Sequence, residues 1–279
     1  MSLPVIAILG AGDLGTACAL RLFRSGFKVI LIEQTMPQDI HYIRNFVSTV
    51  YSGKKEINGV KAKTVSGFLQ QESLPFDNFE ESFLPFMLNN YEIPVLTEND
   101  TTSLAAAEIK YLVITKSNLK DIPAVTALLN DEIKTIVFDD KVSNDGSYII
   151  NNSGLVIYPF LRDDYDAAPA EKQFKEADTI KAPLEGIFIA DKEINSIVRL
   201  KDEVGKISNI PILSPYEGKL SGRLNSGAFV TSGTKIAEIT SLKNEDNDGR
   251  KIPEKYTLLS GAVLEAVMFD LNLEKNQDS

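Results

Sequence analysis

The sequence has little of the residues on which much protein chemistry depends. Its 279 residues include one cysteine (Cys18), one histidine (His41) and no tryptophan. A structural zinc site needs four Cys or His ligands, and a single cysteine cannot form a disulfide within the chain. A nucleophile activated by histidine could use only His41. We therefore expect no metal site, with carboxylate-bound magnesium as the alternative that remains open.

Long apolar runs and clusters of basic residues are also missing. No apolar stretch reaches the length of about 18 residues that a membrane span needs, and Met1–Gly12 lacks the basic start of a signal peptide. With 29 basic and 39 acidic side chains, the net charge is −10, which argues against binding to a nucleic-acid backbone. We expect a cytoplasmic protein with no membrane and no nucleic acid among its partners. The oligomeric state stays open.

The segment that ends at Glu33 predicts a strand, a helix and a second strand. The apolar run Pro4–Leu9 is typical of a strand buried on both faces. A helix is expected from Asp13 to about Ser25, where Gly26 ends it. A second buried strand follows at Phe27–Ile32. Together these segments predict a parallel βαβ unit.

The alternation of strands and helices resumes after Asn90. We expect a hairpin over residues 45–65 that turns near Ser52-Gly53, then an irregular region with one short helix over 66–90. Further strands are expected at Ile93–Leu96, Tyr111–Thr115, Ile133–Phe138 and Leu155–Tyr158. Further helices are expected over residues 102–108 and 122–130. The sequence therefore predicts an α/β fold with a Rossmann-like domain over residues 1–165.

An internal repeat predicts a small β-domain over residues 179–242. Ala182-Pro183-Leu184-Glu185-Gly186 returns further along the chain as Ser214-Pro215-Tyr216-Glu217-Gly218, with Pro183 aligned to Pro215. Lipoyl and biotinyl domains also consist of two halves, with a modified lysine on the hairpin between them. Here the bridge Ser208–Ile212 has no lysine and looks too short for a projecting hairpin, and Lys206 aligns with Glu238 inside a strand. We expect neither lipoyl nor biotin.

A last helix is expected over residues 255–272, docked on the first domain. Its predicted apolar stripe consists of Leu258, Leu259, Val263, Ala266, Val267 and Leu271.

The turn after the first strand carries a glycine motif. It reads Gly10-Ala11-Gly12-Asp13-Leu14-Gly15, a G-x-G-x-x-G between a strand and a helix. Such a loop brings a pyrophosphate close to the backbone and to the amino end of the helix. Glu33, which ends the second strand, is expected to bind a ribose 2′-hydroxyl and favour NAD over NADP. In the alternative interpretation the glycines serve packing alone, and Asp13 would repel a pyrophosphate.

Other candidates are weaker. Asp139-Asp140-Lys141 follows a strand and could face a substrate or magnesium, although a solvated turn is the favoured interpretation. The acidic residues Asp163, Asp164 and Asp166 are more typical of an exposed loop. His41 and Arg44 could reach an adenosine, and Cys18 is expected to be buried and unreactive.

Several segments resemble the YqeB-like family, named the selenium-dependent molybdenum hydroxylase system protein. The resembling segments are Gly10–Leu14, Arg21-Leu22, Ser25–Val29, Glu33, Val50–Gly53, Ile57–Val60, Ile93–Leu96, Tyr111–Ile114, the repeat at 181–240 and Ser260–Ala266. The family usually has a histidine-containing, glycine-rich stretch between its domains, where this chain has Tyr158–Asp164. Its cysteine-bearing segment before the last helix is reduced here to Ile252–Tyr256.

The resemblance implies a Rossmann-type domain joined to a lipoyl-like β-domain. It also implies an accessory role in the maturation or assembly of molybdenum hydroxylases, with those enzymes or their maturation proteins as partners. NAD(H) is the cofactor expected at Gly10–Gly15 and Glu33. Two alternatives stay open: an NAD-dependent oxidoreductase of unknown substrate, and a non-catalytic scaffold with a vestigial glycine motif. No catalytic residue is assigned.

Overall fold

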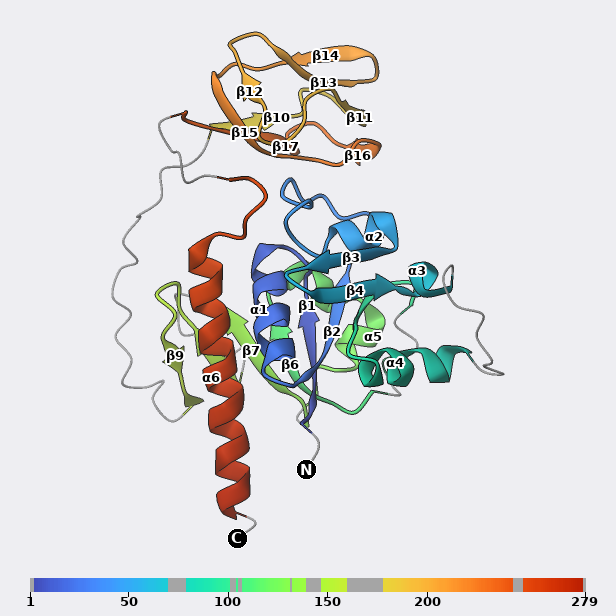
Figure 1. The fold of residues 1–279 in the computed structure, drawn as a ribbon, viewed down its shortest axis with the longest axis vertical. Coiled ribbons are helices and arrows are strands. Elements are labelled where there is room, and N and C mark those ends of the chain that lie inside the picture. Colours follow the sequence, from blue (N-terminus) through green and yellow to red (C-terminus); the bar gives the residue numbers. More distant parts are fainter. Residues whose placement is uncertain are drawn as a thin grey trace. The chain divides into compact units, whose positions relative to one another are not determined.

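The chain folds into two compact units (Figure 1). A computed structural model describes residues 3–69, 79–100, 104, 107–130, 132–138, 147–159, 178–242 and 248–277. The first unit comprises Met1–Thr35, Phe46–Glu171 and Pro253–Ser279, and the second comprises Met36–Asn45 and Lys172–Ile252. The second unit therefore includes a short segment that follows the second strand of the first.

The first unit contains a nine-stranded sheet, counted over the described residues, in the order β3-β4-β5-β2-β1-β6-β7-β8-β9. Its strands are β1 (Val5–Leu9), β2 (Lys28–Glu33), β3 (Lys54–Ile57), β4 (Val60–Thr64), β5 (Ile93–Thr97), β6 (Ile109–Ile114), β7 (Lys134–Phe138), β8 (Tyr148–Ile150) and β9 (Val156–Ile157). Neighbours from β4 to β8 pair in parallel, and β3 and β9 pair antiparallel at the two edges. The predicted α/β class with a parallel sheet is confirmed.

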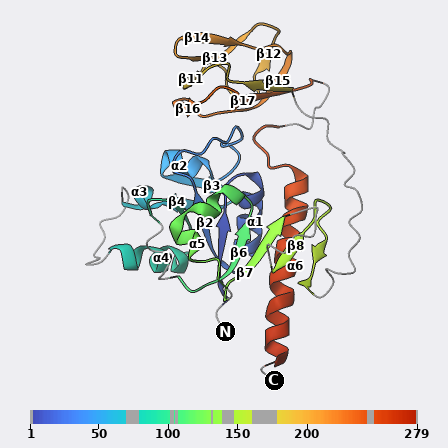
Figure 2. The ribbon, with the colours of Figure 1, turned by 180° about the vertical axis from the view of Figure 1, so that it is seen from behind.

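Helices cover both faces of this sheet. On one face lie α1 (Asp13–Arg24) and α6 (Glu254–Gln277), which pack against each other. On the other lie α4 (Phe79–Asn89) and α5 (Pro123–Thr126), seen from behind in Figure 2. The remaining helical segments are α2 (Ser48–Ser52), α3 (Val65–Leu69) and the 3-10 turn η2 (Ser117–Asp121). Because both faces are covered, the central strands contain continuous apolar runs, as in β1 and in Val29–Ile32 of β2.

The described part of the second unit contains two four-stranded antiparallel sheets. Sheet B has the order β10-β17-β15-β12 and sheet C the order β14-β13-β11-β16. The strands are β10 (Asp178–Lys181), β11 (Gly186–Ala190), β12 (Ile197–Val198), β13 (Glu203–Ile207), β14 (Ile210–Leu213), β15 (Gly218–Arg223), β16 (Ala228–Val230) and β17 (Lys235–Thr240). Their inner faces share one apolar core, which includes Phe188, Val204 and Leu220.

The repeat seen in the sequence relates these two sheets. Strands β10, β11, β12 and β13 return as β14, β15, β16 and β17, so that sheet B maps onto sheet C strand by strand. Backbone conformation repeats as well, because Asn195 and Lys201 have positive φ and their equivalents are Gly227 and Gly233. The repeat is therefore a pseudo-twofold arrangement of two similar halves.

Some local predictions were wrong. Asn45–Tyr51 is not a strand: α2 occupies Ser48–Ser52, and the hairpin β3–β4 turns at Asn58-Gly59. Both residues have positive φ (51° and 81°), the conformation of the two-residue turn that Asn-Gly favours. Residues 66–90 contain the helix α4 and the end of α3, where one short helix was expected.

The prediction that the bridge between the repeats is too short to form a hairpin was also wrong. Ile210–Leu213 forms β14, which pairs with β13 in a hairpin whose tip is Ser208-Asn209. The segment looked too short because it is itself a strand. In α6, Leu258 is 60% exposed and does not belong to the buried stripe. The candidates Asp139–Lys141 and Asp163, Asp164 and Asp166 lie outside the described residues.

Candidate functional site

The glycine loop lies where the order of the parallel strands changes direction. From β1 the chain passes to β2 on one side and later returns to β6 on the other. In open α/β sheets, ligands bind at the carboxyl ends of the strands at such a position. The loop Gly10–Gly12 leaves the carboxyl end of β1 and leads directly into α1.

Two of the three glycines are required by the backbone itself. Gly10 has a φ of +102°, and a Cβ there would lie 2.6 Å from the Thr115 Oγ1. A Cβ at Gly15 would lie only 1.8 Å from the carbonyl oxygen of Gly10. The loop and the first turn of α1 therefore touch backbone to backbone, which explains these glycines whether or not a ligand binds.

The Glu33 carboxylate binds the backbone of the glycine loop. Its Oε2 accepts a hydrogen bond of 2.9 Å from the Ala11 N–H, and its Oε1 accepts one of 2.9 Å from the Gln34 N–H. The side chain is 1% exposed. On the far side of the loop, the Thr16 hydroxyl donates to the Ala11 carbonyl and accepts from the Phe46 N–H. Glu33 thus fixes the conformation of the glycine loop.

The amino end of α1 is not capped by a side chain of the described residues. Gly12 occupies the N-cap position with φ −65° and ψ −168°, an extended conformation open to other residues. Asp13 lies in the first turn and is buried, and Leu14 beside it is half-buried. Backbone N–H groups and the helix dipole make such an end suitable for an anion.

Lys116 is the member of this site that sequence reasoning missed. It follows β6, and its Nζ lies 2.6 Å from the Glu33 Oε1. Its stem crosses the first glycine, since a Cβ at Gly10 would lie 2.9 Å from the Lys116 Cβ. The available signal was its place just past the end of a buried strand, which is where ligand-facing residues of α/β sheets lie.

The other sequence candidates are positioned as follows. His41 and Arg44 belong to the second unit, where the His41 Nε2 lies 3.4 Å from the Glu238 Oε1. Cys18 is buried on α1, and burial raises the pKa of its thiol to about 12, so that it is unreactive near neutral pH.

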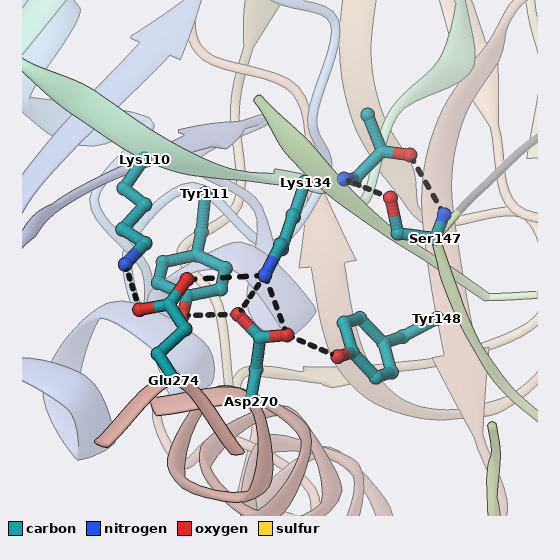
Figure 3. Close-up of polar contacts among 8 residues, drawn as sticks. Lys110, Tyr111, Lys134, Ser147, Tyr148, Asp270 and Glu274 are labelled. Carbon is teal, nitrogen blue, oxygen red and sulfur yellow. Dashed lines mark hydrogen bonds and ion pairs between the residues drawn. The ribbon is translucent and has the colours of Figure 1, made fainter. Parts of the chain in front are cut away.

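A second polar cluster joins α6 to the sheet (Figure 3). The buried Asp270 carboxylate accepts hydrogen bonds from the Tyr111 hydroxyl (2.7 Å), the Tyr148 hydroxyl (2.5 Å) and the Lys134 ammonium (2.7 Å). Glu274, one turn further along α6, pairs with Lys110 and Lys134. This cluster anchors the helix on β6, β7 and β8.

The pKa values of the cluster follow from burial and these contacts. Burial raises the pKa of the Tyr111 and Tyr148 hydroxyls, and their hydrogen bonds to Asp270 raise it further. Burial alone would raise the pKa of Asp270, but the donors Lys134, Tyr148 and Tyr111 outweigh it and lower that pKa. Asp270 is therefore an ionised acceptor and both tyrosines are neutral donors, an arrangement that suits anchoring rather than proton transfer.

A cavity of about 890 Å³ opens at the amino ends of β1, β2, β6 and β7, which is the end of the sheet opposite the glycine loop. Its lining includes Val5, Lys28, Ile133 and Leu271. Within the described part of the chain, no group of three or more His, Cys, Asp or Glu residues could hold a metal ion.

By length and composition, α6 is the one helix among the described residues that could cross a membrane (Glu254–Asn276). The core helix of a soluble protein meets the same criteria. Here α6 buries Val263, Ala266 and Val267 completely and carries the hydrogen-bonded Asp270. We interpret it as a helix that covers the sheet, and the expectation of no membrane partner stays a prediction.

Comparison with known proteins identifies a relative of undefined activity. No family model matches the chain. The chain is 28% identical over 270 residues to the uncharacterized protein YqeB of Escherichia coli (strain K12), a match that covers 95% of this chain and 47% of that protein. It therefore spans about half the length of this relative.

Among solved structures, a succinylglutamate desuccinylase/aspartoacylase from Rhodobacter sphaeroides is 10% identical. The match covers 85% of this chain and 86% of that one, with a TM-score of 0.22.

Proposed function

We propose that this chain, a homologue of the uncharacterized E. coli protein YqeB, is a cytoplasmic accessory protein. In this proposal it binds a nucleotide at Gly10–Gly15. The role that we propose for it is in the maturation or assembly of molybdenum hydroxylases. That role rests on the resemblance of its segments to the YqeB-like family, and the nucleotide site rests on geometry.

The observation that carries nucleotide binding is the position of the glycine loop. It leaves the central strand β1 at the switch point of the sheet and leads into an uncapped helix end. The loop is held in place by the Ala11–Glu33 hydrogen bond, so that it is preformed before any ligand arrives. A preformed loop binds an anion without the cost of ordering flexible backbone.

The test is calorimetric titration of the purified protein with NAD, NADH, NADP and ATP, beside a Gly12→Val variant. Gly12 has an extended backbone that valine adopts, so the variant should fold while its side chain blocks a pyrophosphate. Micromolar binding that the variant loses would support the proposal. Absence of binding by the folded wild type would refute it, and turnover of NADH with carbonyl compounds would indicate an oxidoreductase.

A specific observation also favours the scaffold alternative. On the outer face of sheet C, Ile187, Ile189 and Phe229 are each more than half exposed, and Ile187 pairs directly with Phe229. By the repeat, the equivalent residues of sheet B are Lys219, Ser221 and Ile197. Two of these three equivalents are polar, so the outer face of sheet C carries more exposed apolar side chains than that of sheet B, as is typical of a surface that binds another protein.

The scaffold hypothesis is tested with a purified molybdenum hydroxylase as the candidate partner. An Ile187→Ser, Phe229→Ser double variant should lose association in analytical ultracentrifugation, whereas the control Ile197→Ser, at the position equivalent to Phe229, should retain it. Equal association of both variants would exclude this face, and no association by the wild type would exclude this partner.

A further inference from the structure

The charge that faces solvent at the end of β2 has the opposite sign to the one expected from the sequence. Glu33 was expected to present a carboxylate to a ribose hydroxyl. Instead its side chain is 1% exposed, whereas the Lys116 side chain, whose ammonium contacts it, is 32% exposed. A ligand that reaches the carboxyl end of β2 therefore meets a cation first.

Lys116 reaches this position from the other side of the glycine loop. It follows β6, whereas Glu33 ends β2, and β1 lies between these two strands. The aliphatic stem passes over Gly10, as the 2.9 Å from a Cβ there to the Lys116 Cβ shows. The Lys116–Glu33 pair consequently spans the carboxyl end of β1, where a nucleotide in this architecture would lie.

Glu33 does not depend on Lys116 alone. The backbone N–H groups of Ala11 and Gln34 each donate a 2.9 Å hydrogen bond to its carboxylate. These donors belong to the fixed backbone and stay in place if the lysine side chain turns away. The long, partly exposed Lys116 side chain can thus change partner while the buried carboxylate keeps two hydrogen bonds.

We infer that Lys116 is the cation that receives a phosphate of the bound nucleotide, turning from Glu33 to the ligand. This inference rests on the proposed nucleotide site and deepens it by naming the ligand group and its partner. The phosphate is either part of a 5′-diphosphate or attached to the ribose 2′-oxygen. In the second case the site takes NADP-type ligands, the reverse of the preference that Glu33 alone would give.

The test uses two isomers that carry the same adenosine and the same number of phosphates. ADP has both on the 5′ side, and adenosine 2′,5′-bisphosphate has one on the ribose 2′-oxygen. Each is titrated calorimetrically into the wild type, Lys116→Gln, Lys116→Arg and the control Lys120→Gln. Glutamine keeps an N–H donor for Glu33 without the charge, and Lys120 is a lysine of the same segment in η2.

The wild type should bind one of the isomers more tightly. Lys116→Gln should weaken that binding about tenfold to a hundredfold, the usual worth of a hydrogen bond to a charged group. Lys116→Arg should retain most of the affinity and Lys120→Gln all of it. The isomer that loses affinity identifies the phosphate that Lys116 contacts.

Unchanged or tighter binding by Lys116→Gln would overturn the inference and leave the nucleotide site standing. If the wild type binds neither isomer, the proposed function itself fails. If Lys116→Gln does not fold, judged by its helical circular dichroism, the inference is tested by the nucleotide affinity of Lys116→Arg and by the salt dependence of the wild-type affinity. In that case wild-type affinity that does not fall with increasing salt would overturn the inference, because a phosphate–ammonium contact is weakened by screening.

Discussion

Removal of the Asp270 carboxylate should strongly destabilise the first unit. The carboxylate accepts hydrogen bonds from the Tyr111 and Tyr148 hydroxyls, and both tyrosines are buried. In Asp270→Ala each hydroxyl loses its acceptor, and a buried donor without a partner costs about 1–3 kcal/mol. The Lys134 side chain is 34% exposed, so its loss of a partner adds little. The expected decrease in the free energy of unfolding is about 3–5 kcal/mol.

The same helix provides a matched control. Glu265 accepts a 2.8 Å hydrogen bond from the Tyr158 hydroxyl, the same kind of contact in an exposed place. Glu265→Ala should therefore cost about 0.5 kcal/mol or less. Asp270→Asn, which keeps one carbonyl oxygen as an acceptor, should lie between the two alanine variants.

The measurement is urea unfolding followed by the helical circular dichroism signal. All helices of the described residues belong to the first unit, so this signal reports the unit that contains Asp270. A shift of the midpoint at constant slope gives the change in stability. If Asp270→Ala is no less stable than Glu265→Ala, the reasoning that the buried carboxylate anchors α6 is wrong.

Three further outcomes are expected. Gly15→Ala should fold poorly, or unfold at a much lower temperature in a thermal scan, with or without nucleotide. The reason is that its Cβ would lie 1.8 Å from the Gly10 carbonyl oxygen. A normal melting temperature would contradict this prediction. Burial raises the pKa of Glu238, but the nearby His41 imidazole and the hydrogen-bonded Lys235 ammonium outweigh it and lower that pKa below its ordinary 4.5. This carboxylate therefore stabilises the fold above pH 4.5, and the stabilisation is lost as the pH falls. Urea unfolding across the acid range should accordingly show a shallower loss of stability in Glu238→Gln than in the wild type. The Cys18 thiol should react with a disulfide reagent only in denaturant, and fast reaction of the native protein would show that the thiol is accessible.

The fold class followed from local patterns that the sequence displays directly. The apolar runs of β1 and β2 indicate strands covered on both faces, because alternation would be expected if one face were in water. The return of the Pro183 segment at Pro215 predicted two similar β-halves. The structure has the same turns in both halves, because the positive φ of Asn195 and Lys201 recurs at Gly227 and Gly233. The hairpin was misplaced because the Asn58-Gly59 turn signal was passed over in favour of Ser52-Gly53.

The roles of charged residues were not readable in the same way. Glu33 carries the right residue type at the right spacing for a ribose ligand, but its partners are the Ala11 N–H and Lys116. Lys116 is 83 residues away in the sequence. Its place just past a buried strand predicts that it lies near the carboxyl ends of the strands, but not that its stem crosses Gly10. Asp270 likewise appears as one acid in a helix, and its two tyrosine partners lie 122 and 159 residues earlier.

The sequence by itself determined the parallel sheet, the glycine loop after β1 and the two halves of the β-unit, because spacing, burial pattern and turn chemistry are local properties of the chain. Only the tertiary structure decided which charges meet. That outcome depends on the strand order β2-β1-β6-β7-β8 and on where α6 docks, and both are set by the packing of whole elements. For this reason the glycine motif was visible in the sequence, whereas the lysine that spans it was not.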